Sequence, residues 1–171
     1  PSHGIDRLWA VARARPDIPF VAQESWALPE AARDEMLAQT AVLGNVEFRP
    51  RTADLGAVYR DARLLFAPHR LDNRPRVAAE AQANGIPVVA SAYPGLVEAV
   101  GAGGVLVDPQ APEPVWVDAV GRLWDDTDHY ERLVEAALHH AARPEIDPEV
   151  VTSRFEEALR GLVQGYDSGP H

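Results

Sequence analysis

Residues 70–100 read RLDNRPRVAAEAQANGIPVVASAYPGLVEAV. A helical pattern over residues 75–84 leads into a short apolar run at residues 87–91, and a second helical pattern follows at residues 96–100. A continuous apolar run of this length, bounded by Gly and Pro, indicates a buried strand. A buried strand with a helix on either side is the repeating unit of a parallel α/β fold.

The same alternation continues in both directions along the chain. Strands are predicted at residues 18–23, 46–50, 64–68, 87–91 and 104–108, and helices at 29–43, 55–62, 75–84, 96–100, 113–125, 128–142 and 148–165. Gly44 is expected to end the helix at 29–43 as a C-cap. The pattern predicts an α/β, Rossmann-like, doubly wound parallel sheet with extra C-terminal helices. We expect the last three helices to pack around the sheet.

The bulk composition fits one soluble domain. The chain has 171 residues, 46% of them hydrophobic, and no cysteine. It contains no apolar run of about 20 residues and no signal-peptide pattern, so a cytoplasmic location is expected. We expect residues 1–165 to form the domain and residues 166–171 to be a disordered tail. The chain begins without Met and inside a helical pattern, so an upstream segment is expected.

The charge is unevenly distributed. The net charge of −10 makes a nucleic acid partner improbable, because such partners require a basic face. Seven arginines nevertheless fall within residues 49–76, against three acidic residues: Arg49, Arg51, Arg60, Arg63, Arg70, Arg74 and Arg76. This segment is either a small-anion site or a solvated arginine-rich helix face.

In open parallel sheets, ligands bind beyond the carboxyl ends of the strands. Two loops of this chain are expected at that edge. The first, residues 69–76, enters a helix whose first turn is predicted to contain Pro75. Free N–H groups and the helix dipole at that point favour an anion such as a phosphate. Arg74 and Arg76 flank it. The second loop, Ser91 to Leu96, offers the backbone N–H groups of Gly95 and Leu96 to the same crevice.

Glu80 lies in the second turn of the helix that follows the first loop. Its carboxylate either pairs with Arg76 across one helical turn, or accepts hydrogen bonds from the vicinal hydroxyls of a ribose. Glu98, in the next helix, either joins the site or complements the helix dipole. No histidine has the spacing of a metal ligand, so no metal site is expected.

The motif D-x7-E from Asp72 to Glu80, with EAQANGIPVVAS and YPGLVEAVGAGGVLVD after it, resembles the C-terminal donor-binding domain of retaining glycosyltransferases of family 4 (group 1), which have GT-B architecture. The resemblance extends from about residue 3 to residue 165. It implies that Glu80 holds the ribose of a nucleotide and that Asp72 lies next to the donor sugar. Asp72 is one methylene shorter than the glutamate usual there.

Two further positions depart from the family pattern. The Gly-Phe-Gly that often follows the first acid is replaced by Asn73, Arg74 and Pro75, and proline removes one backbone donor. We expect Arg76 to supply charge to the donor's phosphates or to an anionic sugar. His3 stands where the family usually has a phosphate-binding lysine, and the arginine of that pair would lie upstream of Pro1.

The resemblance implies transfer of a sugar from a nucleotide diphosphate donor, UDP- or GDP-sugar, to a hydroxyl acceptor with retention, and without a cofactor or bound metal. The implied catalytic residues are Asp72 and Arg76. The implied donor-binding residues are Glu80, Arg74, Asn73, Gly95, Leu96, Ser91, Arg49 and Arg51, with Ser25 and Pro50 also near the expected base. The base, the sugar and the acceptor stay open.

The acceptor-binding N-terminal domain of the family has no counterpart in this sequence, so the chain is expected to be an excised or separate donor domain, inactive without that partner. Membrane contact would come only through the full-length enzyme. If the sheet's first strand is missing too, its exposed edge invites homo-oligomer formation. The alternatives are a non-catalytic nucleotide-binding module and a GT-B nucleotide-sugar epimerase. A Rossmann dehydrogenase is disfavoured, since no G-x-G-x-x-G follows a predicted strand.

Overall fold

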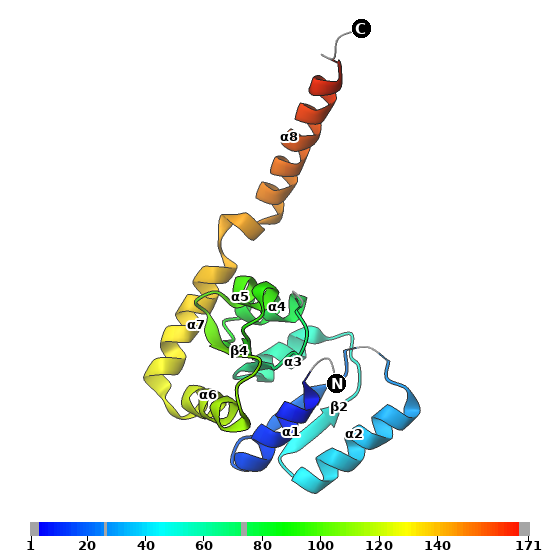
Figure 1. Ribbon diagram of the computed structural model, residues 1–171, viewed down its shortest axis with the longest axis vertical. Coiled ribbons are helices and arrows are strands. Elements are labelled where there is room, and N and C mark those ends of the chain that lie inside the picture. The colour runs from blue at the N-terminus through cyan, green and yellow to red at the C-terminus, as the bar shows by residue number, and fades with distance from the viewer. Residues whose placement is uncertain (1–3, 26, 73–74, 168–171) are drawn as a thin grey trace.

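The computed structural model describes residues 4–25, 27–72 and 75–167, the last five of them by their backbone alone (Figure 1). Within these residues the strands are β1 (Phe20–Gln23), β2 (Val46–Arg49), β3 (Leu65–Ala67), β4 (Val88–Ser91) and β5 (Gly104–Val107). The helices are α1 (Ile5–Ala14), α2 (Glu30–Leu43), α3 (Leu55–Asp61), α4 (Arg76–Ala83), α5 (Pro94–Val100), α6 (Glu113–Asp125), α7 (Thr127–Ala141) and α8 (Pro148–Asp167), with a short 3-10 helix, η1 (Pro144–Ile146).

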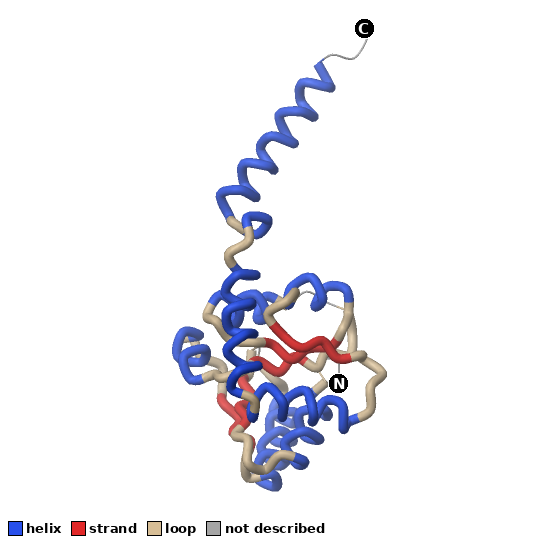
Figure 2. Tube along the Cα trace, turned by 90° about the vertical axis from the view of Figure 1, so that its left-hand side faces the viewer, coloured by secondary structure: helices blue, strands red, loops and turns tan. Residues whose placement is uncertain are grey.

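All the strand pairs described are parallel, as predicted. β1 pairs with β2, with Phe20 opposite Val46, and β4 lies between β3 and β5, with Val88 opposite Leu65 on one side and Gly104 on the other. The strands lie at the centre of the body with helices on both sides (Figure 2). The fold is therefore Rossmann-like. The single predicted sheet is divided in two, because no pairing joins β1 to β3 within the described residues.

One apolar layer spans both sheets. It consists of α1 and α6 packed on strand residues from each sheet: Leu8, Val11, Ala12, Ile18, Phe20, Ala22, Val46, Val89, Val107, Trp116, Val120 and Leu123. Because these residues belong to a single cluster, burial of their apolar surface joins the two sheets into one body without a strand between them.

The opposite face of the three-stranded sheet is covered by α4 and α5. The cluster there is rich in alanine: Ala67, Ala78, Ala81, Ile86, Val88, Ala90, Leu96, Ala99 and Val100. Ala78 and Ala81 of α4 are completely buried. Small side chains let the helix approach the sheet closely, so the first turns of α4 lie beside the carboxyl ends of β3 and β4.

The helix ends follow the expected chemistry. Gly44 adopts a left-handed conformation (φ 71°) at the end of α2 and donates its N–H to the carbonyl of Thr40, which confirms the predicted C-cap. The side chains of Asp54 and Asp126 accept hydrogen bonds from the first turns of α3 and α7.

Helix α8 departs from the prediction. It points away from the body, whereas α6 and α7 pack against it (Figure 1). An apolar stripe at helical spacing is exposed along it: Val151, Phe155, Leu159 and Leu162. The amphipathic pattern correctly identifies the helix but says nothing about which surface covers its apolar face. The helix continues to Asp167, so the first two residues of the predicted tail are helical, and residues 168–171 lie outside the described residues.

Candidate functional site

The loop after β3 is held in place by hydrogen bonds from the side chains of three residues. Arg7 of α1 donates to the carbonyls of Pro68 (3.3 Å) and His69 (3.4 Å), and the hydroxyl of Ser91 donates to His69 as well (2.5 Å). The hydroxyl of Tyr93 donates to the carbonyl of Arg70 (2.9 Å). These bonds occupy the carbonyls of Pro68, His69 and Arg70 and fix the backbone that leads to Asp72.

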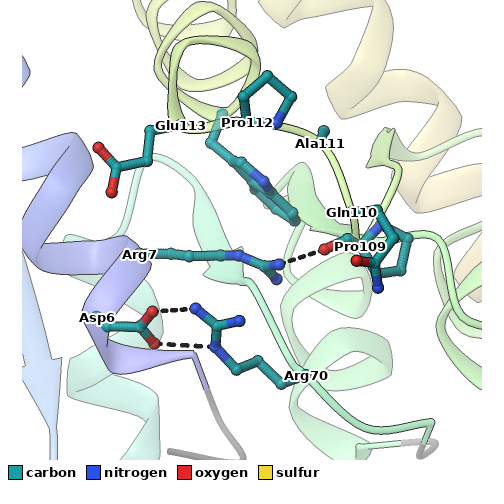
Figure 3. A pocket seen from close by; sticks show the side chains of 9 residues that line it. Asp6, Arg7, Arg70, Pro109, Gln110, Ala111, Pro112 and Glu113 are labelled. Carbon is teal, nitrogen blue, oxygen red and sulfur yellow. Dashed lines mark hydrogen bonds and ion pairs between the residues drawn. The ribbon is translucent and has the colours of Figure 1, made fainter.

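Arg7 has several partners at once. Its guanidinium lies over the indole ring of Trp116, 4.6 Å from the centroid, and also donates to the carbonyl of Pro109 after β5 (Figure 3). Burial, followed by the nearby charge of Arg70, lowers the pKa of Arg7. A single buried side chain therefore joins α1 to the carboxyl ends of β3 and β5. Arg7 lies outside the arginine-rich segment at 49–76, and no sequence pattern singled it out.

Arg70 is paired with a residue at the start of α1. Its guanidinium makes two hydrogen bonds to the carboxylate of Asp6, which lower the pKa of Asp6 and raise that of Arg70 (Figure 3). Both side chains are about half exposed, so the pair adds little to stability. It does fix the side-chain direction of one arginine of the predicted anion-binding segment.

A pocket of about 240 Å³ lies between the start of α1, the loop after β3 and the loop after β5 (Figure 3). It is lined by Asp6, Arg7, Arg70, Pro109, Gln110, Ala111, Pro112, Glu113 and Trp116. Neither Asp72 nor Glu80 lines it. Among the described residues, the pocket is therefore separate from these two acids of the motif.

Asp72 and Gly95 connect the two predicted loops. The backbone N–H of Gly95, at the second position of α5, donates to Oδ1 of Asp72 over 3.0 Å. The loops that follow β3 and β4 therefore meet, as expected for the carboxyl edge of a parallel sheet. Ser91 and Leu96 are completely buried, so their side chains belong to the packing beneath these loops.

Glu80 has an unexpected partner. The hydroxyl of Tyr59, from α3, donates to Oε2 of Glu80 over 2.7 Å. Burial, and then this hydrogen bond, raise the pKa of Tyr59 well above its ordinary value of 10. No ion pair joins Glu80 to Arg76, although the structure describes both residues. The alternative of a simple helical salt bridge is therefore wrong.

Arg76 is exposed and is the first residue of α4, and Pro75 immediately before it is the N-cap, not part of the first turn. An arginine at that point stands beside the free N–H groups of the helix start. Three predicted residues, His3, Asn73 and Arg74, lie outside the described residues.

Comparison with protein families decides what kind of chain this is. The family described as "Glycosyl transferases group 1" matches residues 26–126, more than half of the sequence. The chain belongs to this family. Residues 26–126 include Asp72, Glu80 and Gly95.

Two curated relatives of this group 1 glycosyl transferase chain are D-inositol 3-phosphate glycosyltransferases. The one from Corynebacterium urealyticum is 36% identical over 141 residues, which is 80% of this chain and 31% of the relative. The one from Salinispora arenicola is 42% identical over 136 residues, which is 77% of this chain and 28% of the relative. The chain thus spans about a third of the length of these relatives.

Solved structures share the fold of the group 1 chain. HepE of Anabaena, solved with UDP and glucose, superposes with a TM-score of 0.78 at 24% identity, over 94% of this chain and 45% of that protein. Sucrose-phosphate synthase from Thermosynechococcus elongatus has a TM-score of 0.77 at 22% identity, over 96% of this chain and 43% of that protein. At these identities the likeness concerns the fold, which matches that of GT-B glycosyltransferases.

Of the two arginines that the group 1 chain was predicted to place near the base, one is paired through its guanidinium and the other is bonded through its backbone. The guanidinium of Arg49 pairs with Glu47 (2.8 Å) and lies 3.8 Å from Asp61. Arg51 donates its backbone N–H to Glu24. Ser25 and Pro50 are exposed at the same ends of β1 and β2. Contacts between these residues and a base stay predictions.

Glu24 is a structural residue of this edge that sequence patterns did not single out. Its carboxylate is buried and accepts from the backbone N–H of Leu28 (2.9 Å), from that of Arg51 (3.2 Å) and from the guanidinium of Arg33. The bond from Leu28, opposed by burial and supported by Arg33, lowers the pKa of Glu24. The signal available in the sequence is its place directly after β1.

Two general features complete the description of the group 1 chain. Among the described residues, no group of three His, Cys, Asp or Glu side chains is placed to hold a metal ion. None of the helices described is both long enough and apolar enough to cross a membrane.

Proposed function

We propose that this chain is the donor-binding half of a retaining family 4 glycosyltransferase, which moves a sugar from a nucleotide diphosphate donor to a hydroxyl acceptor. The observation that carries the proposal is the position of the two acids of the D-x7-E motif. Asp72 meets the start of α5, and Glu80 stands in the second turn of α4. Both therefore lie at the edge of a parallel sheet where ligands of such folds bind.

In the proposed reaction the bond between the sugar and the diphosphate breaks, and the leaving diphosphate gains negative charge. In this proposal Arg76, the first residue of α4, and the N-terminus of that helix would stabilise that charge, because preorganised donors act most strongly on charge that develops in the transition state. Asp72 would orient the sugar hydroxyls. Glu80 would accept hydrogen bonds from the ribose.

The similarity to proteins solved with UDP supports a nucleotide diphosphate sugar as the donor, and UDP is the first nucleotide to test. Arg49 ends β2 and Arg51 follows it, where the base would be read. Gly95 and Leu96, in the first turn of α5, and Asn73 and Arg74, shortly before α4 in the sequence, would surround the phosphates. The proposal involves no cofactor and no metal.

The other partners proposed are an acceptor-binding N-terminal domain, without which the chain would be inactive, and a second copy paired through an exposed sheet edge. Membrane contact would be peripheral and would come only through the full-length enzyme. The cysteine-free composition favours a cytoplasmic location.

The first test is calorimetric titration of UDP, GDP, ADP and dTDP into the 171-residue chain, with NAD as a control ligand. We expect one diphosphate to bind selectively. Arg76→Ala and Glu80→Ala should each weaken it by about tenfold, which is the effect of losing one hydrogen bond to a charged group. Arg132→Ala, which removes an exposed arginine of α7, is the matched control and should not change the affinity.

Absence of binding at millimolar concentrations of every diphosphate would contradict the donor-binding function. Equal losses in all three variants would show that general charge, and not the site, attracts the nucleotide. In the protein that joins this chain to its acceptor-binding half, the anomeric configuration of the product, measured by NMR, tests retention. A free sugar epimer as the product would favour an epimerase instead.

A further inference from the structure

The contact between Tyr59 and Glu80 joins two helices that approach the site from different strands. Tyr59 belongs to α3, which follows β2, and Glu80 belongs to α4, which follows β3. The two residues are 21 positions apart in the sequence, and the distance from the Tyr59 hydroxyl to Oε2 of Glu80 is 2.7 Å. This is a hydrogen bond of ordinary O–H···O length to one defined oxygen of the carboxylate.

We propose that Tyr59 is a positioning residue for ribose recognition: its hydroxyl holds Oε2 of Glu80 and thereby directs Oε1 to the hydroxyl groups of the nucleotide's ribose. The inference rests on the proposed function, because it takes Glu80 as the carboxylate that binds ribose. It adds a second residue, on a different helix, to the determinants of the choice between ribose and deoxyribose.

The chemistry of the two side chains fits these roles, in which Tyr59 holds one oxygen of Glu80 and the other oxygen binds the ribose. A carboxylate has two oxygens and about four acceptor sites, whereas a tyrosine hydroxyl has one proton to donate. Tyr59 therefore satisfies one oxygen and leaves acceptor capacity on the other. A glutamate also has three side-chain torsions, and ordering it costs entropy on binding unless it is held beforehand.

Tyr59 is well placed to hold the carboxylate. Its ring is partly buried against the cluster that α4 and α5 form with the three-stranded sheet. Packing on one side and the hydrogen bond on the other fix the direction of the hydroxyl. Because the pKa of Tyr59 lies above 10, the group stays protonated and remains a donor at neutral pH.

The choice of a tyrosine partner also affects Arg76. Arg76 is four residues before Glu80 on the same helix, which is the spacing of a helical ion pair. An ion pair there would draw the arginine towards the carboxylate and neutralise part of its charge. Because Glu80 is held by an uncharged hydroxyl, its side-chain direction is set without using the arginine that we propose for the diphosphate.

The contact links two parts of the expected nucleotide site. The loop between β2 and α3 is where base recognition is expected, and Tyr59 lies one turn into the helix that this loop enters. A displacement of α3 on base binding would therefore be transmitted to the carboxylate that binds the ribose.

The test compares two ligands on four proteins. The nucleoside diphosphate that binds the 171-residue chain and its 2′,3′-dideoxy counterpart are titrated calorimetrically into the wild type, Tyr59→Phe, Glu80→Gln and Tyr130→Phe. The last variant is the matched control: it removes a tyrosine hydroxyl from α7, where the ring packs against Arg63 (3.9 Å) and the apolar cluster of α1 and α6. Melting temperatures are measured in parallel.

We expect the wild type to prefer the ribose form by about tenfold or more, the discrimination that one hydrogen bond to a charged group can give. Tyr59→Phe should weaken binding of the ribose form by about fivefold and leave the affinity for the dideoxy form unchanged, so the ratio of the two affinities falls. Glu80→Gln should bring the ratio close to one. Tyr130→Phe should keep the wild-type ratio.

The unfavourable outcomes are distinct. If Tyr59→Phe weakens both ligands equally and lowers the melting temperature, its role is structural only, and the inference is wrong. If Glu80→Gln abolishes the preference while Tyr59→Phe preserves it, the inference is wrong and the proposed function stands. If the wild type binds no nucleoside diphosphate, the proposed function fails and the inference fails with it.

Discussion

The carboxylate of Asp72 accepts a 3.0 Å hydrogen bond from the backbone N–H of Gly95. An N–H at the second position of a helix has no partner within the helix, and Tyr93, the N-cap residue of α5, makes no side-chain hydrogen bond to it. The cap is supplied instead by a residue more than twenty positions earlier in the chain. In addition to its proposed place beside the sugar, Asp72 therefore caps the start of α5.

Substitutions at Asp72 test this capping role. Asp72→Ala should lower the free energy of unfolding by about 1 kcal/mol, as is typical when a helix loses its capping acceptor. Asp72→Asn keeps a side-chain oxygen that can accept from Gly95 and should lose less. Urea denaturation at pH 7 measures both. Equal stabilities for the wild type and Asp72→Ala would show that the bond is not formed in solution.

Glu24 predicts a dependence of stability on pH. Its pKa is lowered in the folded protein by the N–H of Leu28 first and by Arg33 and Arg51 after it, with burial opposing them. A carboxyl group with a lowered pKa in the folded state stabilises the protein above its unfolded pKa, near 4.5. This stabilisation is lost as the pH falls through the folded pKa, because the protonated group no longer prefers the folded state.

We therefore expect Glu24→Gln to be less stable than the wild type at pH 7, and the difference in melting temperature to shrink below about pH 4.5. Thermal unfolding followed by circular dichroism between pH 3 and pH 7 provides the measurement. Glu30→Gln, on the exposed first turn of α2, is the control and should change little. A difference that stays constant across the pH range would exclude Glu24 as the titrating group.

The sequence predicts this fold well because its elements are marked locally. α6 begins and ends at the predicted residues 113 and 125, and β4 lies within the predicted run at 87–91. Apolar periodicity and Gly or Pro boundaries depend only on neighbouring residues. They therefore predict the helices and strands without knowledge of the tertiary contacts. The direction of α8 is not such a property, since it depends on which surface meets its apolar stripe.

The candidate site was less predictable, because its contacts join residues that are far apart in the sequence. Asp72 and Gly95 were singled out by their positions at strand ends, and the structure joins them. The partnership of Tyr59 with Glu80 involves helices that follow different strands, so no local spacing reveals it. Arg7 was missed because its partners are three backbone carbonyls, which every residue has. No residue type in the sequence therefore marks these contacts.

Two leucine-to-alanine substitutions test the different environments of α6 and α8. Leu123 of α6 is completely buried, whereas Leu162 of α8 is 72% exposed. Leu123→Ala should cost roughly 2 to 5 kcal/mol through lost burial and a cavity. Leu162→Ala should change the stability of the chain by less than about 0.5 kcal/mol. A comparable loss in both variants, measured by urea denaturation, would show that the α8 stripe is covered in solution.

Gly4 and Gly44 offer a matched test of the close contact between α1 and β3. Both glycines have a left-handed backbone, with φ of 70° and 71°. A Cβ atom at Gly4 would lie 1.8 Å from the carbonyl oxygen of Pro68, while one at Gly44 would meet nothing within 4 Å. The two positions therefore share a left-handed φ, and only Gly4 also imposes a steric clash.

We expect Gly44→Ala to cost about 1 kcal/mol, the price of a left-handed alanine, and Gly4→Ala to cost substantially more. The extra loss arises because the start of α1 must move away from Pro68, which also displaces Asp6 and Arg7 from their partners. Equilibrium unfolding in urea gives both values, and nucleotide affinity should fall in Gly4→Ala alone. Equal losses for the two variants would mean that the start of α1 does not press on the end of β3 in solution.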